Sequence, residues 1–383
     1  MRSRILALAY LLFLALAGGV QAQSDGEPQP GPATVEAESA PALGYLEGTI
    51  RRIARDATGS GTALVETRDG RVLEATLPGP DPFTGEVLPP FEVGDRVEVY
   101  FSPDPRGGTS YVVVDWIRRP ALLLLVATFL VVSVLVARLK GLRAFLATAS
   151  SLALIILVII PAIVSGQNAV LVSLLGVGGI LFLAIYFVHG VNWSTTAALA
   201  GTFLATIVTM LLGILFSNLT HLTGLGSEDA AMIAASLPAV ELRGLMLAGL
   251  LIGALGALTD ITIVQASVVR ELAHADPELS SMGLYRRGMN VGLDHIGSLV
   301  NTLVLAYTGA ALPLLVLLGQ GELGFARAVN VELIAAEVVH TLVGSIGLIL
   351  AVPVTTLIAT LMFRGGRFPI KAGERTHTHH HAH

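Results

Sequence analysis

An acidic side chain inside an apolar segment is the feature of this sequence best suited to chemistry. Asp260 lies within the apolar stretch 242–269, ten residues before Arg270. If this stretch crosses a membrane with one boundary near Arg270, Asp260 lies about 15 Å deep, near the midplane. Placing a carboxylate there costs about 2.5–3.5 kcal/mol or more. We therefore expect a proton or cation at Asp260; the alternative is a carboxylate that is paired and only joins helices.

A second polar pattern runs along the stretch 289–318. At 100° per residue, five of its small and polar positions fall within an arc of about 60°: Asn290, Asp294, Gly297, Asn301 and Thr308. His295 lies off this stripe. Because 289–318 follows 242–269 directly, the two are expected to be antiparallel, with Asp260 level with residues 294–301.

A third polar pair lies in the stretch 331–363. Glu337 and His340 are i and i+3, so they share a helix face. The three stretches can bring their polar groups together at mid-depth, where transporter sites usually lie. The expected ion- or substrate-binding residues are Asp260, Asn290, Asp294, Asn301, Glu337 and His340, with Thr262, Gln265, His295, Ser298 and Thr308 as secondary members. The competing interpretation is that these groups are hydrogen-bonded contacts between helices.

Metal and catalytic patterns are largely missing. Within the predicted spans Glu-x-x-His occurs once, at Glu337 and His340, whereas a di-iron bundle needs two such units. The sequence contains no G-x-S-x-G, H-E-x-x-H or Walker-type motif. We therefore predict no catalytic residue and no cofactor, and leave open whether a metal ion is bound or transported. An intramembrane hydrolase with Asp260 and Asp294 as an aspartyl pair is a third hypothesis.

The composition indicates that these residues are held by membrane helices. Of the 383 residues, 53% are hydrophobic and only 13% are charged, which excludes an ordinary soluble enzyme and a disordered chain. The net charge of −5 gives no basic excess for a nucleic-acid partner. Cysteine is absent, so disulfides and thiolate chemistry are excluded. The expected partners are the lipid bilayer and a small solute or ion; the oligomeric state stays open.

The expected fold is an α-helical polytopic membrane protein preceded by a small extracytoplasmic β-barrel-like domain of OB or SH3 type. Seven spans are predicted within residues 119–363: 120–137, 144–164, 168–188, 195–217, 242–269, 289–318 and 331–363. Close helix packing is expected at small residues, namely Gly249, Gly253, Gly256, Gly297 and Gly344. In the loop 218–241, a short helix is expected to start at Ser227.

The remaining segments are read from their composition. Residues 1–22 have the pattern of a signal peptide, which we expect to be cleaved, and 23–42 that of a disordered linker. Short alternating runs predict strands in 43–118, with a hairpin at Asp69-Gly70. This domain is a possible binding site for an envelope partner. Residues 364–383 form a His-rich tail, which can bind a metal or be an incidental tail.

The orientation follows from Lys and Arg in the short loops. With the β domain outside, the inner segments 138–143, 270–288 and 364–375 are basic, whereas the outer loops hold only Arg327. Arg118 and Arg119 go against this trend. The distribution predicts an inner-membrane protein with an extracytoplasmic β domain and a cytoplasmic C-terminus.

The motifs of the C-terminal half resemble a known family. Gly253-Ala254-Leu255-Gly256-Ala257-Leu258-Thr259-Asp260 is similar to the G-A-L-G-A-x-x-D motif of the YibE/F family of bacterial multi-pass membrane proteins. The runs Gly288-Met289-Asn290-Val291-Gly292-Leu293-Asp294, Ile296-Gly297-Ser298, Asn301-Thr302-Leu303, Val343-Gly344-Ser345-Ile346-Gly347 and Ala351-Val352-Pro353 resemble it too. The family often has Arg at the position of Leu293 and an aliphatic residue at that of His295.

The resemblance covers nearly all of the chain after the signal and implies a permease or transport component. The first functional hypothesis is therefore a secondary transporter with a polar site in the middle of the membrane, coupled to protons or cations. The second is a membrane-anchored scaffold whose β domain recognises an envelope partner.

Overall fold

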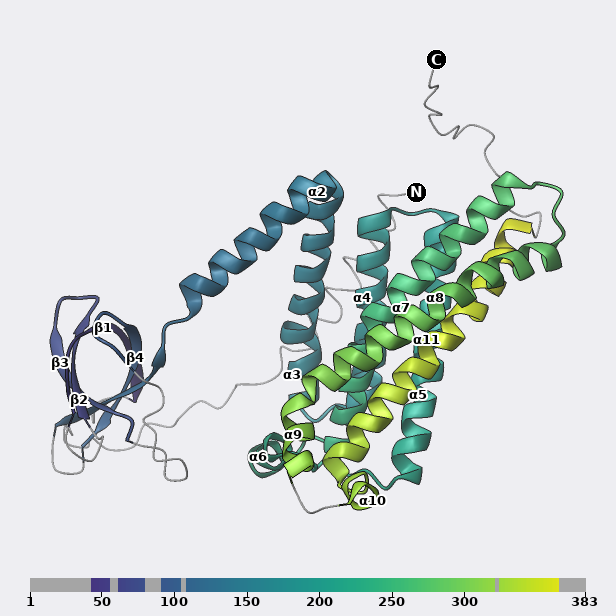
Figure 1. Cartoon of the computed structure of the whole chain (residues 1–383). Helices are drawn as coiled ribbons and strands as arrows, with labels where there is room; N and C mark the ends of the chain where they lie inside the picture. Colours follow the sequence, from purple (N-terminus) through teal and green to yellow (C-terminus); the bar gives the residue numbers. More distant parts are fainter. Residues whose placement is uncertain (1–42, 56–60, 80–90, 105–107, 321–323, 365–383) are drawn as a thin grey trace, which may run out of the picture. The chain divides into compact units, whose positions relative to one another are not determined.

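The computed structural model describes residues 43–55, 61–79, 91–104, 108–320 and 324–364. The chain divides into two compact units, with the boundary between Leu135 and Val136 (Figure 1). The first unit holds the strands and the first part of helix α2 (Arg119–Leu154), residues 119–135, and the second holds the rest of the helices. The predicted signal peptide, the linker and the tail beyond Arg364 lie outside the described residues.

The first unit contains a closed five-stranded barrel. Its strands are β1 (Gly44–Arg55), β2 (Gly61–Thr67), β3 (Val72–Leu77), β4 (Arg96–Pro103) and β5 (Thr109–Trp116), in the order β1-β2-β3-β5-β4. β1 closes the barrel because its first half pairs with β4 and its second half with β2, with a bulge between Ile50 and Arg52. The predicted small barrel is thus confirmed.

Alternation of side chains explains the barrel core. Val97 and Val99 point inward and are fully buried, whereas Arg96 is exposed, as the period of two in a strand requires. The predicted hairpin is also present: β2 and β3 are antiparallel and joined at Asp69-Gly70, where Gly70 has a φ of 81°. A positive φ is readily adopted by glycine.

The second unit is a bundle of long helices. Five helical stretches among the described residues are long and apolar enough to cross a membrane. They are Arg119–Val164, α4 (Ala169–His189), α5 (Trp193–Leu219), α7 (Leu242–Ala275) and α11 (Glu332–Arg364). α8 (Ser281–Ala310) is equally long but carries the polar stripe. The shorter helices are α6 (Glu228–Ser236), α9 (Leu312–Gln320) and α10 (Phe325–Ala328).

The first of these stretches combines two predicted spans. Spans 120–137 and 144–164 occupy α2 (Arg119–Leu154), the π-helical turn η1 (Ile155–Ile159) and α3 (Ile160–Val164). The inner segment expected at 138–143 is reduced to one break at Arg138, where φ is 52° and ψ is −132°. Helix resumes directly, because the following residues Leu139, Leu142, Arg143 and Ala144 are good helix formers.

Side-chain caps account for several helix starts. Ser227 accepts a hydrogen bond from the backbone N–H of Ala230, which confirms the short helix predicted there as α6. Ser280 caps α8 in the same way through Gly283. The stretch predicted as 289–318 is divided, since α8 ends at Ala310 and α9 begins at Leu312, just before Pro313.

The closest approach within the bundle is between α5 and α11. A Cβ atom added at Gly347 would overlap Oγ1 of Thr209 and lie 3.1 Å and 3.3 Å from its Cβ and Cγ2. A Cβ at Gly201 would likewise overlap Oγ1 of Thr355 and lie 3.1 Å from its Cα. By contrast, a Cβ at Gly249 or at two of the other predicted packing positions, Gly256 and Gly297, meets no atom within 4 Å.

We predict that Gly347→Ala and Gly201→Ala each destabilise the bundle by about 1–3 kcal/mol. Rotation of the facing threonine moves its hydroxyl but not its Cβ, which would lie 3.1 Å from the new methyl group at Gly347 and 2.9 Å from that at Gly201. Thermal unfolding of the purified protein in detergent measures this. Gly249→Ala is the matched control and is expected to keep or slightly raise stability, since alanine favours helix. Equal effects at Gly347 and Gly249 would contradict the α5–α11 contact.

Candidate functional site

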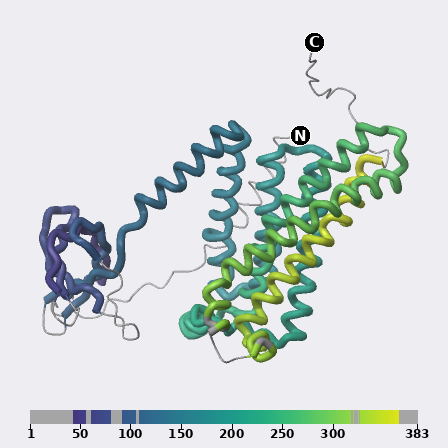
Figure 2. The backbone as a smooth tube through the Cα atoms, viewed as in Figure 1, coloured from purple at the N-terminus to yellow at the C-terminus, as the bar shows by residue number. Residues whose placement is uncertain are grey.

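The predicted site residues lie on α7, α8 and α11, which run side by side (Figure 2). Gly253 of α7 lies against the ring and hydroxyl of Tyr307 on α8, and Gln265 lies against Gly292. These two contacts show that the helices are antiparallel and set their register. Asp260 is therefore level with residues 297–300, inside the polar part of α8.

The polar stripe of α8 faces away from the bundle. Its positions Asn290, Asp294, Gly297, Asn301 and Thr308 are exposed, and so are His295 and Ser298, which lie off the stripe. The opposite face, with Gly288, Gly292 and Leu303, is buried against α7 and α11. The stripe thus exists as one continuous face, and within the described residues no other helix covers it.

Asp260 also lies on an exposed face, that of α7, with Gly253 and Gly256 on the preceding turns. Within the described residues Asp260 forms no ion pair closer than 4 Å, with His189 or with any other basic side chain. The structure therefore presents Asp260 as an exposed carboxylate on α7.

Glu337 and His340 form a separate, half-buried cluster on α11. The neighbouring helix α8 carries Tyr307. The Tyr307 hydroxyl and Nε2 of His340 are buried without a hydrogen-bond partner among the described residues. Tyr307 was not predicted because it lies about 100° away from the stripe of α8; a tyrosine within an apolar run was the available signal.

Two secondary residues are contacts between helices. Gln265 is buried, and its Nε2 donates to the carbonyl of Gly288, 2.8 Å away, and to Oγ1 of Thr356, 2.7 Å away. Thr262 is hydrogen-bonded to Thr202 of α5. These two side chains join α7 to α8, α11 and α5. They match the interhelical interpretation of the sequence.

Gly344 of α11 has ordinary contacts, with an added Cβ 3.4 Å from Leu303 and 3.7 Å from Ala254. Among the described residues, no group of three or more His, Cys, Asp or Glu side chains is arranged to hold a metal ion.

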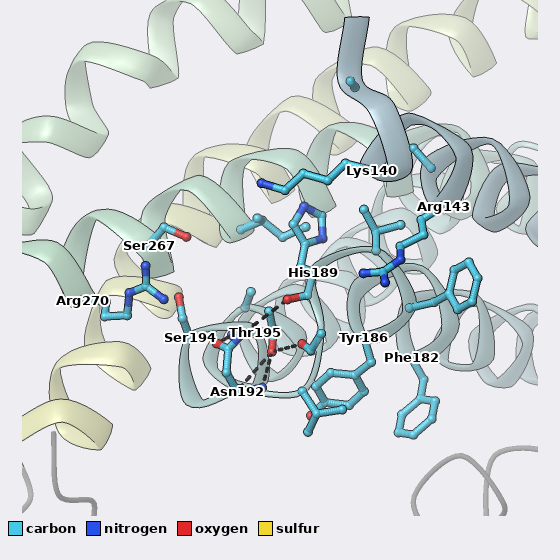
Figure 3. Close-up of a pocket in the computed structure, with 18 of the residues that line it drawn as sticks. Lys140, Arg143, Phe182, Tyr186, His189, Asn192, Ser194, Thr195, Ser267 and Arg270 are labelled. Carbon is cyan, nitrogen blue, oxygen red and sulfur yellow. Dashed lines mark hydrogen bonds between the residues drawn. The ribbon is translucent and has the colours of Figure 1, made fainter. Parts of the chain in front are cut away.

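A large basic pocket lies at one end of the bundle (Figure 3). It has a volume of about 950 Å³ and lies between α2, the end of α4, the start of α5 and α7. Lys140 and Arg143 come from α2, His189 from α4 and Arg270 from α7. From the sequence, Lys140, Arg143 and Arg270 are interpreted only as charges of the inner segments, and His189 is not singled out. Their separation along the chain conceals that these residues line one pocket.

Local structure shapes the rim of this pocket. Gly190 ends α4 with a φ of 78°. Asn192 then caps α5: its side chain accepts from the N–H of Thr195, and the Thr195 hydroxyl accepts from the N–H of Asn192. The short turn between α4 and α5 is therefore fixed, and the first turn of α5 lines the pocket.

Comparison with protein families matches residues 125–365 to the YibE/F-like proteins. The chain belongs to this family. Comparison with the curated proteins and with the solved structures finds no match. Together with its apolar helices, the family assignment makes the chain a multi-pass membrane protein.

The YibE/F-like region begins within α2 and ends one residue after α11. It contains every predicted site residue and all the basic residues of the pocket, whereas the barrel lies outside the match. The family resemblance of the helical motifs is confirmed. Its extension over the β domain stays a prediction.

We predict that Gln265→Leu lowers the stability of the bundle by about 1 kcal/mol, because it removes two buried hydrogen bonds at nearly constant volume. Asn301→Leu is the control, since Asn301 is exposed, and its effect should be within about 0.5 kcal/mol. Unfolding in detergent compares the two variants. A larger loss for Asn301→Leu would mean that the stripe, rather than Gln265, holds α8 in place.

Proposed function

We propose that the protein is a permease that moves a small solute or ion along a polar route formed by α7 and α8. The observation that carries this proposal is the exposed polar face of α8, level with Asp260 on α7, within a bundle of otherwise apolar helices. Polar side chains at this depth are costly in lipid and almost always face water or protein. A route that admits water and a polar solute supplies that environment.

The proposal includes seven spans. The stretch Arg119–Val164 has 46 residues, about 69 Å at 1.5 Å per residue, which is enough for two crossings of a core about 30 Å thick. The break at Arg138 is where the chain would turn between them. α8 is then a further span, and its polar face lines the proposed route.

The orientation is part of the same proposal. Lys140, Arg143 and Arg270 line a pocket at one end of the bundle. The ends of α7 and α11 meet nearby, where Arg364 donates to the carbonyl of Pro277. A basic end faces the cytoplasm in most inner-membrane proteins. The barrel, one crossing away from Arg138, is then extracytoplasmic.

The polar route can be tested by labelling single cysteines, because the chain has no native cysteine. Asn301→Cys in membranes should react at least about tenfold faster with the charged reagent methanethiosulfonate-ethyltrimethylammonium than Leu350→Cys, since only a hydrated thiol forms the reactive thiolate. Leu350 is an exposed residue of α11. Asn301 is fourteen residues from Arg287, and Leu350 is fourteen residues from Arg364. Because both arginines lie at the same end of the bundle, the two cysteines are matched in depth. Equally slow labelling of both cysteines would remove the proposed route.

Transport itself is tested by the solute and metal content of cells. Asp260→Asn and Asp294→Asn keep the shape of the side chain but remove its charge, so cells with either variant should resemble cells without the protein. Asp229→Asn on α6 is the control and should behave as the wild type. Wild-type content in both variants, at equal protein levels, would refute a role for these carboxylates. An absence of any difference between wild-type and protein-free cells would favour the scaffold hypothesis.

A further inference from the structure

The basic pocket is lined by cationic residues that are not part of the proposed polar route on α7 and α8. Its described lining includes Lys140, Arg143, His189 and Arg270, and no aspartate or glutamate. Three of these side chains are cationic at neutral pH. Like charges that converge on a concave surface raise its positive potential and attract anions.

The charges are also poorly neutralised by the protein. Within the described part of the chain, Lys140 and Arg143 take part in no ion pair, and Arg270 pairs only with the adjacent, exposed Glu271, at 2.8 Å. Figure 3 shows Lys140, Arg143 and His189 on one side of the pocket and Ser267 with Arg270 on the other. An anion between them would meet cationic donors from α2 and α7 and the imidazole of His189 from α4.

The pocket supplies neutral donors and a helix end as well. Ser194 and Ser267 line it, and neither hydroxyl is hydrogen-bonded to another described residue. The first turn of the 27-residue helix α5 is part of the wall. The N-terminus of a helix carries partial positive charge and favours anions. These features add to the four basic side chains rather than standing alone.

The size and the remaining lining define the ligand further. A volume of about 950 Å³ is at the upper end of the range for small-molecule sites, about 300–1,000 Å³, and is much larger than one inorganic anion needs. Part of the pocket wall is apolar and is formed by Phe182, Phe187 and Ile263. Several cations match a multiply charged group better than a single carboxylate, and arginine binds phosphate oxygens in pairs.

We infer that this pocket binds a phosphate-bearing organic anion, either the headgroup of an anionic phospholipid or a soluble phosphorylated molecule. Positive charge at this end of the bundle does not by itself explain the pocket. Arg286 and Arg287 add positive charge to the same end but do not line it. The site is independent of the polar route on α8, so either assignment can fail without the other.

The test uses the purified full-length protein and two kinds of probe. Glycerol 3-phosphate, with glycerol as its control, represents a soluble ligand. Nanodiscs of phosphatidylglycerol, compared with phosphatidylcholine, represent a headgroup. The readouts are the thermal shift and the dissociation constant for the soluble probe, and lipid retained in native mass spectrometry for the second.

At least one phosphate-bearing probe should bind the wild type in preference to its phosphate-free or zwitterionic control. Lys140→Gln/Arg143→Gln should weaken this binding at least about tenfold, because charged hydrogen bonds to the ligand are lost. Arg286→Gln/Arg287→Gln removes the same charge from the same end and should leave binding unchanged. The single variants Lys140→Gln and Arg143→Gln provide the measurement if the double variant does not fold.

Binding of the soluble probe identifies a phosphorylated solute, and binding in the nanodisc arm alone identifies a lipid headgroup. Either result, with the expected difference between the two double variants, supports the site. Absence of binding in both arms overturns it, as does an equal loss in the control variant.

Discussion

The bundle depends on the close approach of α5 and α11. Gly201 and Gly347 lack the Cβ atoms that would overlap Thr355 and Thr209, so the two backbones come close enough for extensive van der Waals contact. Lipid tails provide no hydrophobic force between helices, which leaves such contacts to hold a membrane bundle together. α11 is also fixed at both ends. At one, Glu332 accepts from the N–H groups of Thr223 and Gly224; at the other, Arg364 donates to backbone carbonyls, among them that of Pro277.

The direction of the polar face of α8 follows from this arrangement. Gln265 of α7 donates to Thr356 of α11 and to the backbone of α8. It reaches α8 because Gly288 and Gly292 leave room for its amide. A helix fixed by that glycine face must turn its opposite side away from the bundle. The stripe from Asn290 to Thr308 is on that opposite side. The same hydrogen bonds that stabilise the bundle therefore present the polar groups outward at the depth of Asp260.

Much of this architecture could be predicted from local pattern. Alternation predicted the barrel, Ser227 the short helix α6, and a period of 3.6 the polar face of α8. The glycines show the limit of such patterns, because Gly249 and Gly347 look alike within their own helices, yet only Gly347 meets a neighbour. The spacing of residues along one helix predicts which of them share a face, but not which other helix packs against that face. The same limit hid the basic pocket, since Lys140 and Arg270 are 130 positions apart in the sequence.

The pocket and Asp260 are connected through α7. Asp260, Ile263 and Ser267 are spaced i, i+3 and i+7 and so share a helix face, and the last two line the pocket. An anion bound at Ser267 would lie seven residues along α7 from Asp260, about 10 Å at 1.5 Å per residue. The two proposed sites therefore share one face of α7 but no lining side chain, which is why each assignment can fail without the other.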